Sequence, residues 1–151
     1  MPSRSICTCT KLRQLTRQLS CLYDHHLASE GLTIGQYSYL ARIGRFGPMG
    51  VIPLANEFGM DRSTMSRGLK PLIAEGWVET VDLPLEMLTD KRSFGVQLTE
   101  AGRAKWQSAL PKWEEAQQEI NRILGDETLH GLIALVDDAN HRIERYEQVA
   151  R

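Results

Sequence analysis

The feature of this chain that most restricts its fold is a tight turn, Gly59-Met60-Asp61, between two helical segments of unequal length. The shorter segment is Val51–Phe58, and the longer one runs from Arg62 to about Glu75. Asp61 is a good N-cap, because its carboxylate can accept hydrogen bonds from the free amides of the next turn. Gly76 is a typical helix-stop residue at the other end. The pattern predicts a helix-turn-helix.

Further helices are predicted on both sides of this unit. Hydrophobic residues recur at three- and four-residue steps over residues 10–28, after the predicted Thr33 cap, after the predicted Thr99 cap and again after Gly125. This spacing is typical of amphipathic helices. We expect the helix after Thr33 to stop at the helix-breaking residues Gly44, Gly47 and Pro48.

Two short strands are predicted after the helix-turn-helix. They cover residues 77–83 and 93–98, and in the second strand larger apolar residues alternate with polar or small ones. Their connection, residues 84–92, is too long for a two-residue hairpin turn and ends in Asp90-Lys91-Arg92. The predicted fold class is therefore α+β, mainly α with a small β-hairpin wing: a winged helix-turn-helix flanked by N- and C-terminal helices.

Charge is distributed unevenly, although the net charge of the chain is only −1. Residues 1–41 carry +2, residues 42–105 carry +1, and residues 106–151 carry −4. The stretch 62–74 contains three basic residues and no acid. Local charge sets the field that a polyanion meets, so the second helix of the helix-turn-helix is suited to nucleic acid. The acidic C-terminal third is expected to face away from it.

Composition and the N-terminus restrict the class of protein. Apolar residues make up 42% of the chain and charged residues 25%, which excludes wholesale disorder. No apolar run approaches the roughly 18 residues of a membrane span, so no membrane partner is expected. The first ten residues lack the apolar core of a signal peptide. We therefore expect a cytoplasmic protein.

Three cysteines, Cys7, Cys9 and Cys21, lie near the N-terminus. An odd number in a cytoplasmic chain argues against a disulfide scaffold. His25 and His26 follow closely, but no second ligand pair occurs at zinc-finger spacing. No metal and no cofactor are predicted.

The predicted winged helix-turn-helix can dock on double-stranded DNA, because the major groove is wide enough for one α-helix. Arg67 can donate the paired hydrogen bonds that guanine accepts, whereas Lys70 is better placed for a phosphate. Lys91 and Arg92 on the wing would reach the adjacent minor groove. The outward positions predicted for the second helix are Arg62, Ser63, Thr64, Ser66, Arg67 and Lys70.

Four motifs in this order resemble the MarR family of transcriptional regulators, over about residues 10 to 148. They are Gly31-Leu32-Thr33 with Gln36-Tyr37, the run from Leu54 to Leu72, Gly76-Trp77-Val78-Glu79, and Asp90-Lys91-Arg92 with Leu98-Thr99-Glu100-Ala101-Gly102. The resemblance implies a repressor that binds a pseudo-palindromic operator as a homodimer. Within one unit, 1–151, it implies a DNA-binding part at 33–98 and dimerisation helices at 10–30 and 99–148.

The resemblance also assigns a role to the wing. Asp90 is expected to be a buried partner that orients Arg92, and Arg92 is expected to enter the minor groove. This chain departs from the family pattern in the segment Leu83–Leu88, which is more apolar than the usual basic tip. We therefore expect its wing to pack differently or to offer fewer basic contacts.

Members of the family commonly respond to small phenolic or aromatic acids bound beside the dimerisation part. The candidate residues for such an effector site are His25, His26, Tyr37, Tyr39 and Arg42. A second possibility is oxidation of Cys9, because its spacing to Tyr23 resembles that in the peroxide-sensing branch of the family. Cys7 or Cys21 would then resolve a sulfenic acid.

Two other classes of function stay open at this point. Cys21 and His25 have the i, i+4 spacing of a thiol–imidazole pair, but no oxyanion-hole loop, phosphate-binding glycine motif or zinc-binding His-Glu motif accompanies them. We therefore predict that the chain is not an enzyme. A winged helix that docks a protein without touching DNA is the other alternative, since fold does not determine function.

Overall fold

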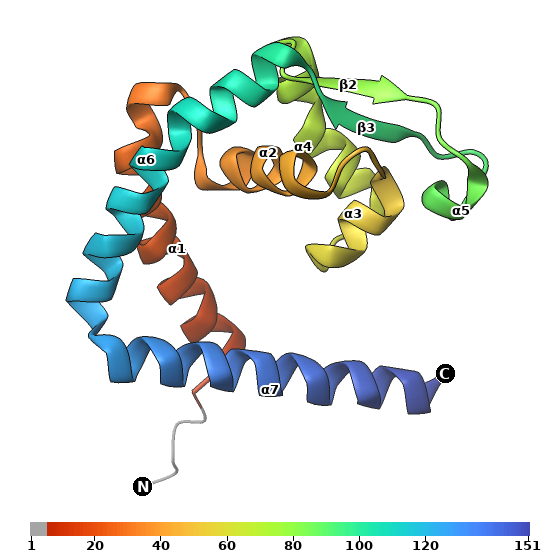
Figure 1. The fold of residues 1–151 in the computed structure, drawn as a ribbon. Helices are drawn as coiled ribbons and strands as arrows, with labels where there is room; N and C mark the ends of the chain where they lie inside the picture. The colour runs from red at the N-terminus through yellow and green to blue at the C-terminus, as the bar shows by residue number, and fades with distance from the viewer. Residues whose placement is uncertain (1–5) are drawn as a thin grey trace, which may run out of the picture.

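The computed structural model describes residues 6–151 (Figure 1); the first five residues, part of the stretch compared with signal peptides, lie outside the described range. The elements are α1 (Thr8–Leu27), η1 (Ala28–Glu30), α2 (Ile34–Phe46), β1 (Met49–Gly50), α3 (Val51–Glu57), α4 (Arg62–Ala74), β2 (Val78–Val81), α5 (Leu85–Leu88), β3 (Gly95–Leu98), α6 (Glu100–Leu124) and α7 (Asp126–Ala150). This order confirms the predicted winged helix-turn-helix with helices on both sides. We call residues 32–98 the winged lobe.

The caps of α2 and α4 form as the sequence indicates. Asp61 Oδ1 accepts a hydrogen bond from the Thr64 amide at 2.7 Å, and Thr33 forms a capping box with Gln36. The prediction that Gly44 halts α2 is wrong, because the helix continues to Phe46 and ends at Gly47. A side chain at Gly44 would lie 2.5 Å from the ring of Trp106, so this glycine permits close packing of α2 against α6.

The wing differs from the predicted hairpin in three ways. Its strands are shorter than predicted, and β1 adds a third strand, so that the antiparallel sheet has the order β1-β3-β2. The expected loop contains the short helix α5. Leu88 of α5 is buried, and a side chain at Gly50 would lie 2.3 Å from the Met87 carbonyl oxygen. The apolar segment therefore folds back on β1 instead of extending as a basic tip.

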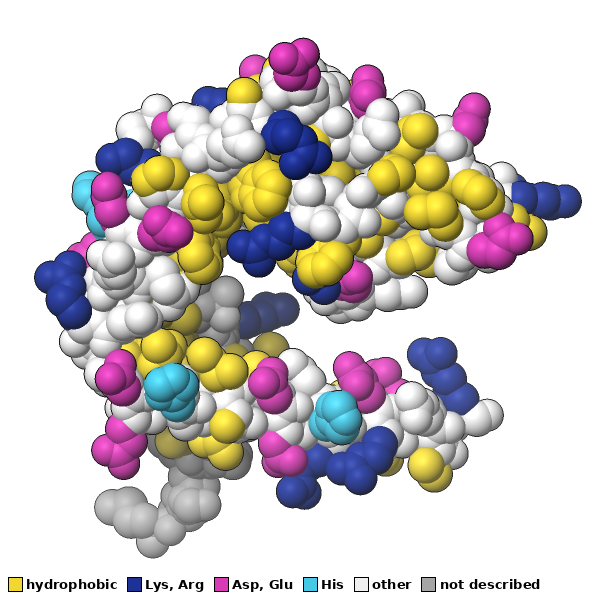
Figure 2. All heavy atoms as spheres, viewed as in Figure 1, with side chains coloured by type: hydrophobic (Ala, Val, Ile, Leu, Met, Phe, Trp, Pro, Cys, Tyr) yellow, Lys and Arg dark blue, Asp and Glu magenta, His cyan; other side chains and the backbone are white. Residues whose placement is uncertain are grey.

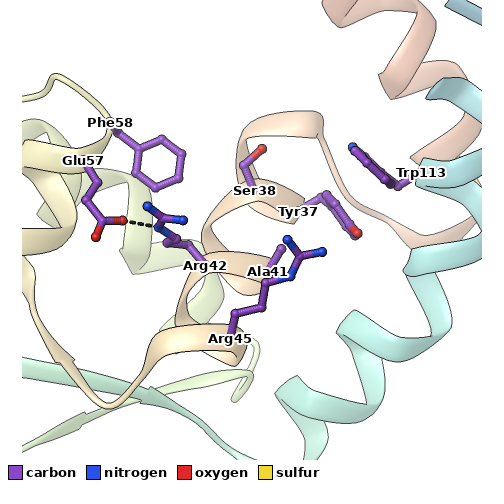
Figure 3. Close-up of a pocket in the computed structure, with 8 residues that line it drawn as sticks. All are labelled: Tyr37, Ser38, Ala41, Arg42, Arg45, Glu57, Phe58 and Trp113. Carbon is purple, nitrogen blue, oxygen red and sulfur yellow. Dashed lines mark hydrogen bonds and ion pairs between the residues drawn. The ribbon is translucent and has the colours of Figure 1, made fainter. Parts of the chain in front are cut away.

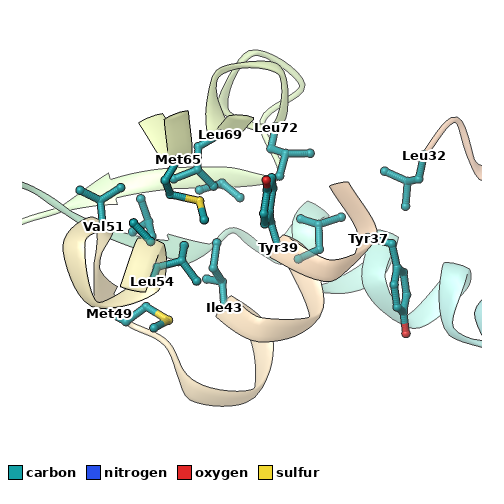
Figure 4. Packing of buried hydrophobic residues seen from close by; sticks show 14 of the residues in the cluster. Leu32, Tyr37, Tyr39, Ile43, Met49, Val51, Leu54, Met65, Leu69 and Leu72 are labelled. Atoms are coloured by element: carbon teal, nitrogen blue, oxygen red, sulfur yellow. The ribbon is translucent and has the colours of Figure 1, made fainter. Parts of the chain in front are cut away.

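The core of the winged lobe lies between α2, α3, α4 and the sheet (Figure 4). Complete burial of a leucine, isoleucine or methionine side chain contributes roughly 1.5–3 kcal/mol, so this core holds α4 in a fixed orientation. The residues that are no more than 1% exposed there include Leu40, Ile43, Leu54, Met65, Leu69 and Leu72.

The helices outside the lobe are packed less completely. α1 lies against α6, where Leu27, Ala109 and Ala116 are fully buried. α7 leaves this pair and extends below the winged lobe (Figure 1). The space-filling view shows a hollow between α7 and the winged lobe (Figure 2). No residue of α7 is buried. Across residues 6–151, none of the helices has both the length and the apolar character needed to cross a membrane.

Candidate nucleic-acid interface

The outer face of α4 carries the side chains that the sequence places there. Met65, Leu69 and Leu72 point into the core, so the positions between them face outward. Arg62, Arg67 and Lys70 are exposed and line one hollow with Ser63, Ser66 and Asp61. Thr64 is half-buried and accepts a hydrogen bond from Arg67 Nη2 at 3.4 Å. The helix therefore presents three cations and short hydroxyl groups on one surface.

The wing places Arg92 beside the start of α4. Asp90 Oδ1 accepts from the Arg92 amide at 2.8 Å, and Asp90 Oδ2 accepts from Arg92 Nη2 at 3.2 Å. These hydrogen bonds hold the pKa of Asp90 below its usual value. Arg62 Nη2 also donates to the Arg92 carbonyl oxygen at 3.2 Å, which connects the wing with α4.

The prediction for the wing is wrong about the burial of Asp90, and the structure separates Lys91 from Arg92. Asp90 orients Arg92 as expected, but its side chain is 33% exposed and so is not buried. Asp90 belongs to the loop between α5 and β3, which runs over the surface, and its ion-pair partner Arg92 is 81% exposed. Lys91 lines a separate hollow with apolar residues of α5, including Leu85 and Leu88. The structure therefore brings Arg92, but not Lys91, together with the basic face of α4.

A second candidate site lies between the winged lobe and α6 (Figure 3). It is a pocket of about 310 Å³ with aromatic walls and two arginines. Tyr37 and Trp113 stack with ring centroids 5.9 Å apart and an interplanar angle of 13°. Burial raises the pKa of Tyr37, so its hydroxyl stays neutral near pH 7. The residues that line the pocket are Tyr37, Ser38, Ala41, Arg42, Arg45, Glu57, Phe58 and Trp113.

Only two of the predicted effector-site residues, Tyr37 and Arg42, line this pocket. Tyr39 points the other way and packs edge-on against Phe58, at a centroid distance of 5.1 Å. His26 forms an ion pair with Glu119 on α6, and its ring meets that of His25 edge-on, so both histidines lie away from the pocket.

Sequence reasoning missed several lining residues, notably Arg45 and Trp113. Arg45 could have been found, because Tyr37, Ala41 and Arg45 follow one another at four-residue steps on one face of α2. Trp113 comes from α6, 76 positions after Tyr37, and no local spacing indicates that contact.

Comparisons with known proteins identify the fold and the family. A model described as the MarR family matches residues 32–85. The solved structure of the Mycobacterium tuberculosis transcriptional regulator MosR, in complex with DNA, is 32% identical with a TM-score of 0.76. The alignment covers 91% of this chain and 98% of MosR. This chain belongs to the MarR family. It is therefore a member of a family of transcriptional regulators.

Other members share the fold at lower identity. A probable transcriptional regulator from Pseudomonas aeruginosa is 25% identical, with a TM-score of 0.75 and coverage of 87% of this chain and 96% of that chain. A mutant of MarR from Escherichia coli, complexed with operator DNA, is 23% identical, with a TM-score of 0.73 and coverage of 86% of this chain and 91% of that chain. No curated protein matches the chain in a sequence search.

The cysteines of this MarR-family chain are all exposed and free of disulfides. Cys7 is the N-cap residue of α1, and a side-chain hydrogen bond with Thr10 holds the pKa of its thiol below the usual value. Cys9 and Tyr23 lie on the same helix 14 residues apart, which is about 21 Å along its axis. The Tyr23 hydroxyl donates instead to Gln117 Oε1. One chain therefore does not bring Cys9 and Tyr23 together.

No group of three or more His, Cys, Asp or Glu side chains within residues 6–151 is arranged to hold a metal ion.

Proposed function

We propose that this MarR-family regulator is a cytoplasmic homodimeric repressor that binds a pseudo-palindromic DNA operator. The observation that supports this most directly is the shared surface formed by the basic face of α4 and the Arg92 side of the wing. In this proposal residues 33–98 bind DNA, residues 10–30 and 99–148 form the dimer, and residues 1–151 act as one unit without catalysis.

Each DNA contact has a proposed chemical role. Arg67 donates to a guanine edge in the major groove, Lys70 and the hydroxyl groups of α4 contact phosphates or base edges, and Arg92 enters the minor groove. Asp90 orients Arg92 by the hydrogen bonds described above. The solved complex of MosR with DNA supports DNA binding by this chain.

The proposed dimer is supported by the apolar side chains that one chain leaves in water. Along α7 they recur at helical spacing while no residue of that helix is buried. Such a stripe needs a partner surface, and a second copy supplies it symmetrically. A dimer also provides the two recognition helices, about 34 Å apart, that a palindromic operator requires. The exposed large hydrophobic residues of α7 are Ile133, Leu135, Val136, Ile143, Tyr146 and Val149.

Fluorescence anisotropy tests the DNA proposal, using the DNA upstream of the protein's own gene against a scrambled duplex at several salt concentrations. Arg67→Ala should weaken operator binding by roughly 1–3 kcal/mol and relax the preference at one base position. Lys70→Ala should weaken binding to all sequences and reduce the salt slope by about 1. Binding that is weak and insensitive to salt would instead favour a protein-docking winged helix.

We further propose that a small aromatic carboxylate occupies the pocket beside Trp113 and relieves repression. The pocket is at the lower end of the usual size range for small-molecule sites, and its flat Tyr37–Trp113 wall suits an aromatic ring. Arg45 lines the pocket, and no ion pair engages it among the described residues, so its guanidinium is available for a carboxylate. Tyr37 adds a hydroxyl donor.

Calorimetric titration with 2-hydroxybenzoate tests the effector proposal. The wild-type protein should bind it, Arg45→Gln should bind it at least tenfold more weakly, and Arg122→Gln on the far part of α6 serves as the control for loss of one positive charge. Equal affinities for Arg45→Gln and Arg122→Gln would contradict an anion site at this pocket. Benzyl alcohol, which lacks the carboxylate, should not bind.

A thiol sensor is the second candidate, and the lowered pKa of Cys7 favours it. The Cys7 thiolate would attack a hydroperoxide, form a sulfenic acid and release the alcohol; the Cys9 thiol would then displace water to give a disulfide. Residues two apart do not face each other on a helix, so this bond would unwind the first turn of α1. Cys9 as the primary sensor, with Tyr23 of a second copy beside it, is the alternative form of this proposal.

Variants distinguish these forms. Cys7→Ser should abolish the loss of DNA affinity on adding cumene hydroperoxide, whereas Cys21→Ser should retain it. If Cys7→Ser still responds and Cys9→Ser does not, Cys9 is the primary sensor. A response retained by the Cys7→Ser/Cys9→Ser double variant would exclude this thiol pair altogether.

A further inference from the structure

One wall of the pocket is closed by an ion pair that joins two elements of the winged lobe. Arg42 on α2 donates through Nε to Glu57 Oε2, and Glu57 is the last residue of α3 (Figure 3). The Arg42 guanidinium also lies 4.5 Å from the centroid of the Phe46 ring. Both members of the pair are less than half exposed, at 39% and 37%. The pair therefore ties the end of α3 to α2 at the edge of the pocket.

The same wall is connected to the recognition helix α4 through Tyr39. Phe58, which follows Glu57 and lines the pocket, packs edge-on against Tyr39. The Tyr39 ring fills the space where Gly68 of α4 lacks a side chain, because an added Cβ would lie 3.0 Å from that ring. The chain then turns at Gly59, where φ is +63°, and begins α4 at Arg62. Movement of Glu57 therefore shifts groups that pack on α4.

The Arg42–Glu57 ion pair disfavours binding of the proposed ligand for an electrostatic reason. A carboxylate that reaches Arg42 or Arg45 inside this pocket enters beside the negative charge of Glu57. The two negative charges repel each other, and both carboxylates compete for the Arg42 guanidinium. Either the ligand is held off or Glu57 gives up Arg42 and leaves the pocket wall.

We infer that Glu57 is the positioning residue through which an anionic effector acts on the recognition helix, by losing Arg42 to the effector's carboxylate. This inference rests on the effector proposal above. In the DNA-binding form Glu57 is paired with Arg42 and α3 holds the start of α4; in the effector-bound form Arg42 is paired with the ligand. Linkage requires the coupling to be reciprocal, so the paired form favours DNA and disfavours the anion.

Glu57→Gln tests the inference, because it removes the charge and keeps the size of the side chain. It should tighten 2-hydroxybenzoate binding and weaken operator binding, each by about two- to fivefold, the range expected for losing a partly exposed ion pair. Glu79→Gln, on β2 outside the pocket, is the matched control for loss of one negative charge on the lobe. Damage to the fold would weaken both affinities, so the opposite signs distinguish coupling from a structural defect.

Each result has a definite meaning. Opposite changes in Glu57→Gln but not in Glu79→Gln support the inference. If the wild-type protein binds the probe and Glu57→Gln changes neither affinity, or weakens both, the inference is overturned while the effector proposal stands. If neither wild type nor Glu57→Gln binds the probe, the effector proposal fails and the inference fails with it.

Discussion

The winged lobe buries many of its large hydrophobic residues, whereas α7 leaves many of its own exposed. In the lobe, Leu54, Leu69 and Leu72 are completely buried by contacts made within one chain. On α7, Leu135 is 71% exposed, Tyr146 is 74% exposed and Val149 is 88% exposed, and no residue is buried. The lobe therefore carries its own core, whereas α7 has an apolar surface that no residue within the described range 6–151 buries.

This contrast separates what each region needs in order to work. A DNA-reading surface has to hold several side chains in fixed relative positions, and a complete core under α4 does that within one chain. The distance between two such surfaces is a different property, and in the proposed dimer it would depend on the helices outside the lobe. A change in the arrangement of that dimer would then alter operator affinity while each DNA-binding lobe stays intact.

The largest effect is expected inside the lobe. Leu69→Ala, on the buried side of α4, should lower the free energy of unfolding by about 2–5 kcal/mol through lost burial and a cavity. Urea unfolding should show the loss at every protein concentration. Leu135→Ala on α7 is the matched control, and its cost should depend on concentration because it acts on association. Equal, concentration-independent losses would contradict the contrast.

The next largest effect should come from a charge placed on α7. Ile143→Glu puts a carboxylate into the proposed dimer interface, where an unpaired charge is costly. We expect light scattering to show a monomer and operator affinity to fall at least tenfold, because a monomer binds one half-site. Gln148→Glu, another exposed position of α7, is the control. A monomer that kept full operator affinity would break the proposed link between α7 and DNA recognition.

The sequence predicted best what short-range chemistry determines. The Asp61 and Thr33 caps and the Asp90–Arg92 pair depend on neighbours a few positions away, and the structure contains them. The features that the sequence could not predict depend on contacts between residues far apart in the chain. In the sequence, Gly44 has the character of a helix stop. In the structure, the ring of Trp106, 62 residues later, occupies the space that a side chain at position 44 would need.

The wing and the pocket show the same limit. From the sequence we expected only that the apolar segment, which forms α5, departs from the usual basic tip. Its packing against Gly50 of β1 could not be predicted, because Gly50 lies much earlier in the chain. Tyr37 and Arg42 were found from the sequence, but Trp113 reaches them only through the packing of α6 on the lobe. His25 and His26 do not line the pocket, because His26 faces Glu115 and Glu119 of α6 and His25 is exposed.

A smaller effect should separate the wing from α4 within the lobe. Arg62→Ala removes the hydrogen bond to the Arg92 carbonyl oxygen and should weaken operator binding by a few-fold, as expected for loss of one such bond. In an Arg92→Ala background the same substitution should have much less effect, if Arg62 acts by placing Arg92. Anisotropy on the four proteins of this cycle measures the coupling. Additive losses would show that Arg62 contacts DNA by itself.

The smallest effect should be the acid dependence of the α4 cap. Hydrogen bonds from Thr64 hold the pKa of Asp61 below its ordinary value of 3.8, so its stabilising contribution is present above that pH and is lost as the pH falls through the lowered value. Asp61→Asn keeps an acceptor at the N-cap but does not titrate. Thermal unfolding should therefore find wild type slightly more stable at about pH 7, since the carboxylate also interacts favourably with the helix N-terminus. The difference should shrink as the pH falls below 3.8 and through the lowered pKa of Asp61. A difference that stayed constant across this range would mean that the charge of Asp61 does not stabilise α4 and that its cap acts through the hydrogen bond alone.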